Sequence, residues 1–82
     1  MTQQEYAVRA DALKGRLYGM AFLYLGSQSL AVDAVDEAVY LGLRSCHKLR
    51  EEAFFDTWLT RILINACNAE LRRHKREIAM AE

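Results

Sequence analysis

Residues 54–76 read FFDTWLTRILINACNAELRRHKR, and their pattern decides which kind of fold this chain can form. Plotted at about 100° per residue, as an α-helix requires, the stretch separates into two faces of different chemistry. One face is apolar and is predicted to pack inward: Phe55, Leu59, Ile62, Ala66 and Ala69. The roughly opposite face carries hydrogen-bonding and positive groups: Thr57, Arg61, Asn65, Asn68 and Arg72. The stretch is therefore predicted to be a two-faced helix of an all-α protein.

The end of this helix is strongly basic, with Arg72, Arg73, His74, Lys75 and Arg76 in succession. Cations at a helix C-terminus complement the helix dipole, and this simpler interpretation accounts for a basic last turn. It does not account for Arg61, Asn65 and Asn68, which lie on the same face before the basic run begins. Because cations attract phosphates and Asn and Arg can hydrogen-bond to base edges, the face is predicted to bind nucleic acid.

Further candidate DNA contacts lie before and near the start of this helix. Lys48 and Arg50 add positive charge in the preceding loop, and Phe54 or Trp58 could stack on unpaired bases. Trp58 has a competing interpretation as a core anchor, with only its ring edge exposed. Phe54 and Phe55 are neighbours and cannot share one helical face, so one of them is predicted to enter the core.

Length and composition favour a single helical domain. The chain has 82 residues, of which 52% are hydrophobic and none is proline, so we expect a compact three-helix or four-helix bundle spanning 1–82 with its core at about 4–76. No apolar run reaches the ~18 residues of a membrane span, and the polar N-terminus lacks the apolar core of a signal peptide. A cytoplasmic protein without membrane insertion is predicted.

A first helix is expected over about 4–25. Its apolar stripe comprises Leu13, Leu17, Met20, Ala21 and Tyr24, and its cations Arg9, Lys14 and Arg16 are expected to face solvent. Gly15 and Gly19 weaken a helix interior, so close packing against a neighbouring helix is predicted at both. Gly26 is a natural left-handed stop, and Ser27 or Ser29 can cap the next helix.

The second helix is predicted over about 30–48. Its core face comprises Leu30, Ala31, Ala34, Val35, Ala38, Val39 and Cys46. The other face carries Asp33, Asp36, Glu37, Tyr40 and Arg44. An acidic first turn that complements the helix dipole explains Asp33, but Glu37 lies deeper in the helix and repels Asp33 at a spacing of four residues. A protein-docking face explains this cluster better than a merely solvated face does.

The formal net charge of zero hides two patches of opposite sign, which indicates two different partners. Catalysis is not expected, because the sequence offers no nucleophile with its base, no glycine-rich phosphate loop and no close pair of metal ligands. The acids Asp33, Asp36 and Glu37 are expected on a surface without a cleft. Cys46 and Cys67 are predicted to be buried, reduced thiols rather than zinc ligands, and no cofactor or metal is expected.

The segments LYGMAFLYLG, AVDAVDEAVYLGL and FFDTWLTRILINACNAELRR, in this order, resemble region 2 of bacterial sigma factors of the small extracytoplasmic-function (ECF) group. The resemblance spans about 13–76. Its most specific part is the pattern F-x-x-W-L-x-x-I-x-x-N followed by L-R-R, which is formed by Phe55, Trp58, Leu59, Ile62, Asn65, Leu71, Arg72 and Arg73.

The resemblance implies a helical bundle whose second helix docks on the beta-prime clamp helices of core RNA polymerase. It assigns that docking to Asp33, Asp36, Glu37, Tyr40 and Arg44. It further implies that the third helix and the loop 48–52 capture the non-template strand of the promoter minus-ten element, with Asn65 at the pocket of a flipped base. An anti-sigma factor is a further implied partner.

The sequence also departs from the family's pattern. Asp36 replaces a usual Gln, Leu43 an aromatic residue, Thr60 a frequent Tyr and Ala69 a frequent Asp, and Glu51 replaces the loop Gly. The region 4 helix-turn-helix domain of full family members is absent, so the chain is expected to be an excised domain or a shortened relative. The alternative function is an interaction module, binding polymerase or an anti-sigma factor, that has lost DNA recognition.

Overall fold

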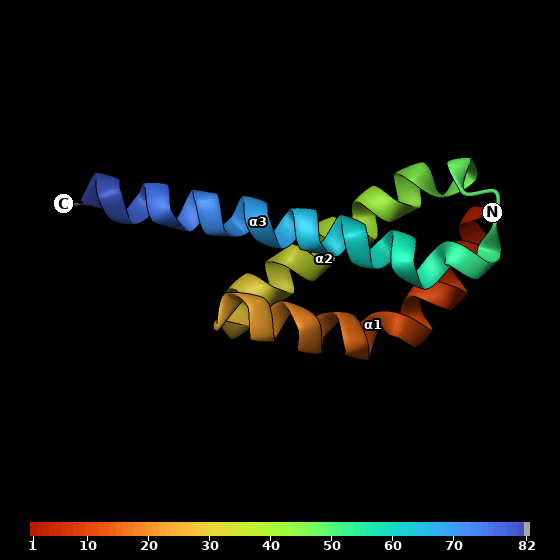
Figure 1. Ribbon diagram of the computed structural model, residues 1–82, viewed down its shortest axis with the longest axis horizontal. Coiled ribbons are helices and arrows are strands. Elements are labelled where there is room, and N and C mark those ends of the chain that lie inside the picture. Colours follow the sequence, from red (N-terminus) through yellow and green to blue (C-terminus); the bar gives the residue numbers. More distant parts are fainter. Residues whose placement is uncertain (82) are drawn as a thin grey trace.

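A computed structural model describes residues 1–81 as an all-α bundle. Its elements are α1 (Gln3–Leu25), α2 (Gln28–Ser45), the short 3-10 turns η1 (Cys46–Lys48) and η2 (Glu52–Phe54), and α3 (Phe55–Ala81). In Figure 1, α2 crosses from the end of α1 to the start of α3, and α3 runs along the bundle and beyond it, giving extents of 46 × 21 × 17 Å. The predicted all-α fold is confirmed, with three helices as its framework.

The helix ends follow local sequence signals. Thr2 accepts a hydrogen bond from the Glu5 amide, and the Glu5 carboxylate accepts one from the Thr2 amide, which makes a complete capping box at α1. Gly26 ends α1 with a φ of 67°, and the Ser27 hydroxyl accepts from the Leu30 amide at the start of α2. The predicted stop at Gly26 is confirmed, and of the two predicted caps, Ser27 and Ser29, Ser27 is the one that forms.

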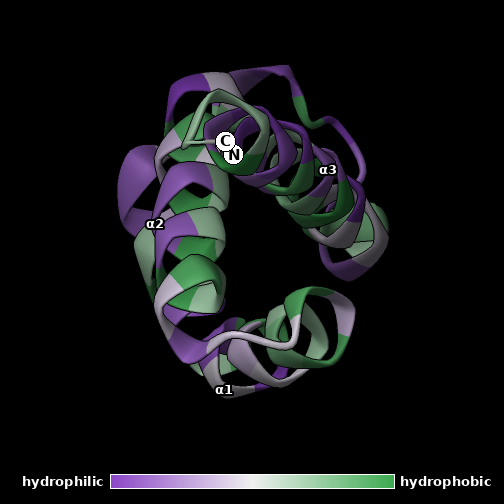
Figure 2. Ribbon diagram, turned by 90° about the vertical axis from the view of Figure 1, so that its left-hand side faces the viewer, coloured by the Kyte–Doolittle hydropathy of each residue, from purple (hydrophilic) through white to green (hydrophobic). Residues whose placement is uncertain are grey.

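The core lies where the three helices face one another. Figure 2 shows hydrophobic residues along the inner sides of α2 and α3. Every helix contributes fully buried side chains, among them Leu17, Val35, Phe55 and Leu59. Of the core face predicted for α2, Ala31, Ala34, Val35, Ala38 and Cys46 are buried, whereas Leu30 and Val39 are half-buried. In α1, Leu13, Leu17 and Ala21 are buried as predicted, Met20 is half-buried and Tyr24 is exposed.

The buried arc of α3 is rotated from the predicted one. Phe55, Leu59 and Ala66 are buried as expected, but Ile62 and Ala69 are only half-buried. Leu63, Cys67 and Glu70 are buried instead. Since α3 contacts both α1 and α2, its buried surface is wider than the single stripe that faces one partner.

The glycines pack differently from the prediction. Gly15 and Gly19 are exposed, and a Cβ atom at either would meet nothing within 4 Å, so the expected close packing there is wrong. The close approach occurs instead at Gly42 in α2, where a Cβ atom would collide with the Tyr6 hydroxyl and lie 2.9 Å from the Tyr6 Cζ atom. Gly42 therefore makes room for Tyr6, whose hydroxyl donates a 2.6 Å hydrogen bond to the Val39 carbonyl.

The start of α3 carries an aromatic cluster. Phe55 is fully buried and Phe54 is 62% exposed, which confirms that only one of the two enters the core. The Tyr6 ring lies edge-on to both Phe55 and Trp58, at centroid distances of 5.8 and 6.3 Å. These contacts tie the first turn of α3 to α1.

Candidate nucleic-acid interface

The polar face predicted for α3 exists on the folded bundle. Thr57, Arg61, Asn65 and Arg72 are all exposed, so they are available to a partner. Asn68 differs from them because it is half-buried and its Oδ1 atom accepts a 2.6 Å hydrogen bond from the Tyr24 hydroxyl of α1. That acceptor serves to hold α1 and α3 together, which leaves Arg61 and Asn65 as the freer hydrogen-bonding groups.

A surface hollow of about 340 Å³ adjoins this face. It lies between α1 and α3 and is lined by Arg16, Asp56, Thr57, Thr60, Arg61 and Ile64. Its lining combines hydroxyls, a carboxylate and guanidinium groups, which together can both donate and accept hydrogen bonds. The hollow is therefore a chemically suitable place for a polar planar group next to Arg61.

The loop before α3 is built from two short turns. The Leu49 amide donates to the Cys46 carbonyl at 3.1 Å, and the Phe54 amide donates to the Glu51 carbonyl at 3.0 Å. Lys48, Arg50 and Glu51 are exposed, whereas Leu49 is half-buried and packs against the core. The two cations predicted in this loop thus face solvent at the same end of the bundle as the start of α3.

Trp58 is half-buried rather than free. Its ring lies 5.9 Å from that of Phe55, centroid to centroid, and it packs against the hydrophobic core. The competing interpretation of Trp58 as a core anchor therefore agrees with the structure. Phe54, at 62% exposed, is the aromatic ring near the loop that solvent reaches most freely.

The basic run continues in helical form beyond the bundle. Arg72, Arg73, His74, Lys75 and Arg76 are exposed, and α3 continues beyond them to Ala81. Arg73 is partly committed, because its Nη1 atom lies 3.0 Å from the Oε1 atom of Glu70, whose side chain is only 7% exposed. Arg72, Lys75 and Arg76 are exposed cations for which no ion pair is seen among residues 1–81.

The acidic face of α2 is exposed as a unit, with Asp33, Asp36, Glu37, Tyr40 and Arg44 all on the surface. The Arg44 guanidinium lies 5.8 Å from the centroid of the Tyr40 ring. Asp33 lines a hollow shared with Glu70, Arg73 and His74 of α3, while Asp36 faces the other side, toward α1. The face therefore spans the width of α2 between its two neighbours.

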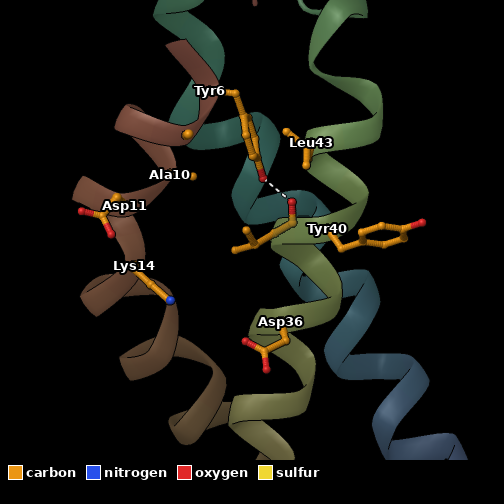
Figure 3. Close-up of a pocket in the computed structure, with 9 residues that line it drawn as sticks. Tyr6, Ala10, Asp11, Lys14, Asp36, Tyr40 and Leu43 are labelled. Carbon is orange, nitrogen blue, oxygen red and sulfur yellow. Dashed lines mark hydrogen bonds between the residues drawn. The ribbon is translucent and has the colours of Figure 1, made fainter. Parts of the chain in front are cut away.

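The groove between α1 and α2 corrects one expectation. Asp36 and Tyr40 border a hollow of about 450 Å³ that also involves Asp11, Lys14 and the apolar residues Ala10 and Leu43 (Figure 3). The acids of α2 were expected on a surface without a cleft, and this is wrong for Asp36 and for Asp33, which lines the smaller hollow beside α3. Much of the lining of the larger hollow is apolar and comes from both α1 and α2, with Tyr6, Ala10 and Leu43 among its residues.

Arg9 and Arg16 were both expected to face solvent, which holds for Arg16 but not for the half-buried Arg9, and both contact the start of α3. The Nη1 atom of Arg9 donates to the Glu52 carbonyl at 3.2 Å, and its Nη2 atom lies 3.9 Å from the Asp56 carboxylate. Arg16 lies 3.8 Å from the same carboxylate. The partners are far apart in the sequence, so the periodicity of α1 contains no signal for these contacts.

Two buried titratable groups have raised pKa values, whereas hydrogen bonds from Thr2 lower the pKa of the exposed Glu5 carboxylate. Burial raises the pKa of Tyr6 to about 12, with a smaller contribution from Cys46, and burial followed by the proximity of Glu70 raises the pKa of the Cys67 thiol. Cys46 and Cys67 are both buried and free, as predicted. Within residues 1–81, no group of three metal-ligating side chains gathers, and none of the helices there has the length and apolarity needed to cross a bilayer.

Comparison with known protein families decides the relationship. The sequence profile of the family described as Sigma-70 region 2 matches residues 10–77, which is most of the chain. The chain belongs to the Sigma-70 region 2 family. Sigma-70 region 2 domains are non-enzymatic parts of sigma factors that act in RNA polymerase binding and promoter melting. Comparisons with curated proteins and with solved structures give no significant match.

Proposed function

We propose that this sigma-70 region 2 domain belongs to the ECF group and recognises and melts the promoter minus-ten element. It would work in the cytoplasm with core RNA polymerase as its obligatory partner. The observation that carries the proposal is the exposure of Arg61 and Asn65 on α3, one helical turn apart, with Arg61 lining the hollow between α1 and α3. Exposed amide and guanidinium groups at this spacing can contact an unstacked base and its backbone together.

The role in melting follows from which DNA form this surface can bind. The edges of paired bases are partly occupied by their partners, whereas a flipped base offers its whole edge to Asn65 and the loop 48–52. Flipping costs a few kcal/mol of unstacking, which pocket contacts and phosphate attraction by Arg72, Lys75 and Arg76 offset. Because the domain binds the open form better than the duplex, binding shifts the equilibrium toward melted DNA.

The acidic face of α2 is the proposed dock for the beta-prime clamp helices. Asp33, Asp36 and Glu37 supply negative charge, and Tyr40, which is 54% exposed, supplies an apolar surface at the centre. Interface hot spots commonly combine an aromatic anchor with surrounding charges that select the partner. The same face could also receive an anti-sigma factor, in competition with polymerase.

A second candidate function is an interaction module without DNA recognition. The observation that favours it is the loop, where Glu51 and Glu52 place carboxylates close to the proposed path of a polyanion. Like charges at this place weaken phosphate binding. The two functions share the α2 face and differ only in what α3 does.

The test measures binding of the chain to short single-stranded minus-ten DNAs with every base varied in turn. Asn65→Ala is expected to weaken the preferred DNA by about tenfold and to flatten the preference at one base, because a specific base contact contributes ~1–3 kcal/mol. Arg61→Ala should weaken binding to all the DNAs. The same variants should bind the clamp-helix coiled coil as the parent does.

A charge-reversed variant serves as the matched control. Asp33→Lys with Glu37→Lys alters the acidic face of α2 and leaves Arg61 and Asn65 of α3 intact, so it should abolish binding to the clamp helices without weakening DNA capture. If Asn65→Ala and Arg61→Ala retain full DNA affinity and preference, the DNA role of α3 is wrong and the interaction module is the better description.

A further inference from the structure

Arg9 lies just before the region that the family profile matches, which begins at residue 10. Its side chain nevertheless reaches the segment that joins the loop 48–52 to α3. It hydrogen-bonds to the Glu52 carbonyl at 3.2 Å, lies 3.9 Å from the Asp56 carboxylate, and places its Cζ atom 4.7 Å from the centroid of the Phe55 ring. The Arg9 side chain thus contacts the Glu52 backbone, the Asp56 carboxylate and the Phe55 ring.

The Glu52 carbonyl is a structural acceptor in its own right. It also accepts the Phe55 amide, which closes the η2 turn at the start of α3. Arg9 therefore binds the same oxygen that ends the loop. A planar guanidinium can donate to this oxygen and cover an aromatic face at the same time, which an ammonium group on a flexible chain does less well.

Arg16 provides an internal comparison. It shares only the Asp56 carboxylate with Arg9, at 3.8 Å, and its side chain is 72% exposed. Ion pairs at such exposed positions contribute little, because water and salt screen them. The feature specific to Arg9 is therefore its contact with the Glu52 carbonyl and the Phe55 ring.

The other end of the loop is held independently. Leu49 packs against the core, and its amide is bonded to the Cys46 carbonyl. With Leu49 fixed by the core and Glu52 fixed by Arg9, only Arg50 and Glu51 lie between the two anchors. Ordering both ends of so short a segment leaves it few conformations.

We propose that Arg9 is a positioning residue that braces the loop 48–52 against the start of α3 and thereby sets the selectivity of this loop among DNA bases. The role of Arg9 in base selectivity rests on the proposed DNA function, whereas its role as a structural brace does not. Base readout requires groups held at fixed distances, so a loosened loop loses discrimination before it loses general phosphate attraction.

Amide hydrogen exchange tests the brace without DNA. In Arg9→Ala, the Phe54 and Phe55 amides should exchange about five- to tenfold faster than in the parent, as expected for loss of a hydrogen bond from a charged donor. Amides in the middle of α2 should keep their rates, which shows that the bundle remains folded. Arg16→Ala is the matched control and should leave the Phe54 and Phe55 rates unchanged. Equal rates in Arg9→Ala and the parent would overturn the brace.

The single-stranded DNA series tests its consequence. Arg9→Ala should reduce the preference among bases several-fold and leave the salt dependence of binding unchanged. Arg9→Lys keeps the positive charge but should restore neither the base preference nor the amide exchange rates to the full values of the parent. Full restoration by Arg9→Lys would show that charge alone acts and would overturn the positioning role, as would an unchanged base preference in Arg9→Ala. A parent chain without any base preference would instead refute the proposed function and the selectivity role, and the exchange rates would still decide the brace.

Discussion

The two halves of α3 differ in nearly every physical respect although they form one continuous helix. Residues 55–70 contain all the buried positions of the helix, from Phe55 to Glu70. Residues 72–81 are exposed throughout and extend beyond the other helices, as the blue end of the chain in Figure 1 shows. The first half is placed by tertiary packing, whereas the second half continues a helix whose nucleation has already been achieved.

In the proposed function, this difference matches the two kinds of contact that a nucleic acid offers. Arg61 and Asn65 belong to the packed half, where the helix is held by α1 and α2 and a side chain can be aimed at a base. Arg72, Lys75 and Arg76 belong to the projecting half, where attraction to phosphates needs charge more than exact geometry. A helix with one anchored half and one free half can therefore divide selectivity and affinity between its halves.

The largest expected effect comes from removing a packed side chain. Leu63 is 1% exposed, so Leu63→Ala should lower the free energy of unfolding by about 2–5 kcal/mol through lost burial and a remaining cavity. Chemical denaturation monitored by circular dichroism measures it. The control is Ile78→Ala in the projecting half, where Ile78 is 50% exposed and the change should stay within about 0.5 kcal/mol. Similar losses in both variants would mean that the projecting half is packed as well.

A smaller effect on the free energy of unfolding is expected at alkaline pH and concerns Tyr6, which anchors the packed half of α3. Tyr6 packs on Phe55 and Trp58, and burial raises its pKa from 10.0 to about 12. Between these two values the folded state retains a proton that the unfolded state releases. The stabilising contribution of the protonated Tyr6 hydroxyl is therefore complete below pH 10 and is lost as the pH rises toward 12. The free energy of unfolding should fall over this range by at most about 2–3 kcal/mol.

Tyr6→Phe isolates this contribution. The variant cannot donate to the Val39 carbonyl, so it should lose about 0.5–1.5 kcal/mol at neutral pH. In return, its unfolding free energy should fall less steeply than that of the parent between pH 10 and 12. Parallel pH profiles for the two proteins would contradict the assignment of this titration to Tyr6.

The smallest effect on stability, and a clear one on binding, is expected in the projecting half. Arg72→Gln with Arg76→Gln should change the unfolding free energy by no more than about 0.5 kcal/mol, since both side chains are exposed. If both contact phosphates of a single strand, the slope of log affinity against log salt should decrease in magnitude by about 1.4. Arg73 is left intact because it pairs with the buried Glu70.

Arg44→Gln is the control for this measurement, because Arg44 is an exposed cation on α2 that is not among the residues proposed to bind DNA. It should leave the slope unchanged. A slope that decreases equally in both proteins would show that net charge, rather than the projecting half of α3, governs the salt dependence.

The local features of this protein were predictable because each depends on residues close in sequence. The helix period, the stop at Gly26, the cap at Ser27 and the acidic face of α2 all follow from rules that act over one or two turns. The two faces of α3 follow in the same way, including the exposure of Arg61 and Asn65. These features were sufficient to identify the all-α fold.

Only the tertiary structure decided which arc of α3 is buried, why Gly42 must lack a side chain and where Arg9 points. Leu63 and Cys67 are buried in place of Ile62 and Ala69 because helices flank α3 on two sides, and the sequence of α3 does not state the positions of its neighbours. Gly42 meets Tyr6, and Arg9 meets Glu52, a residue 43 positions away. Contacts over such separations have no period in the sequence, so they follow from the packing of the helices alone.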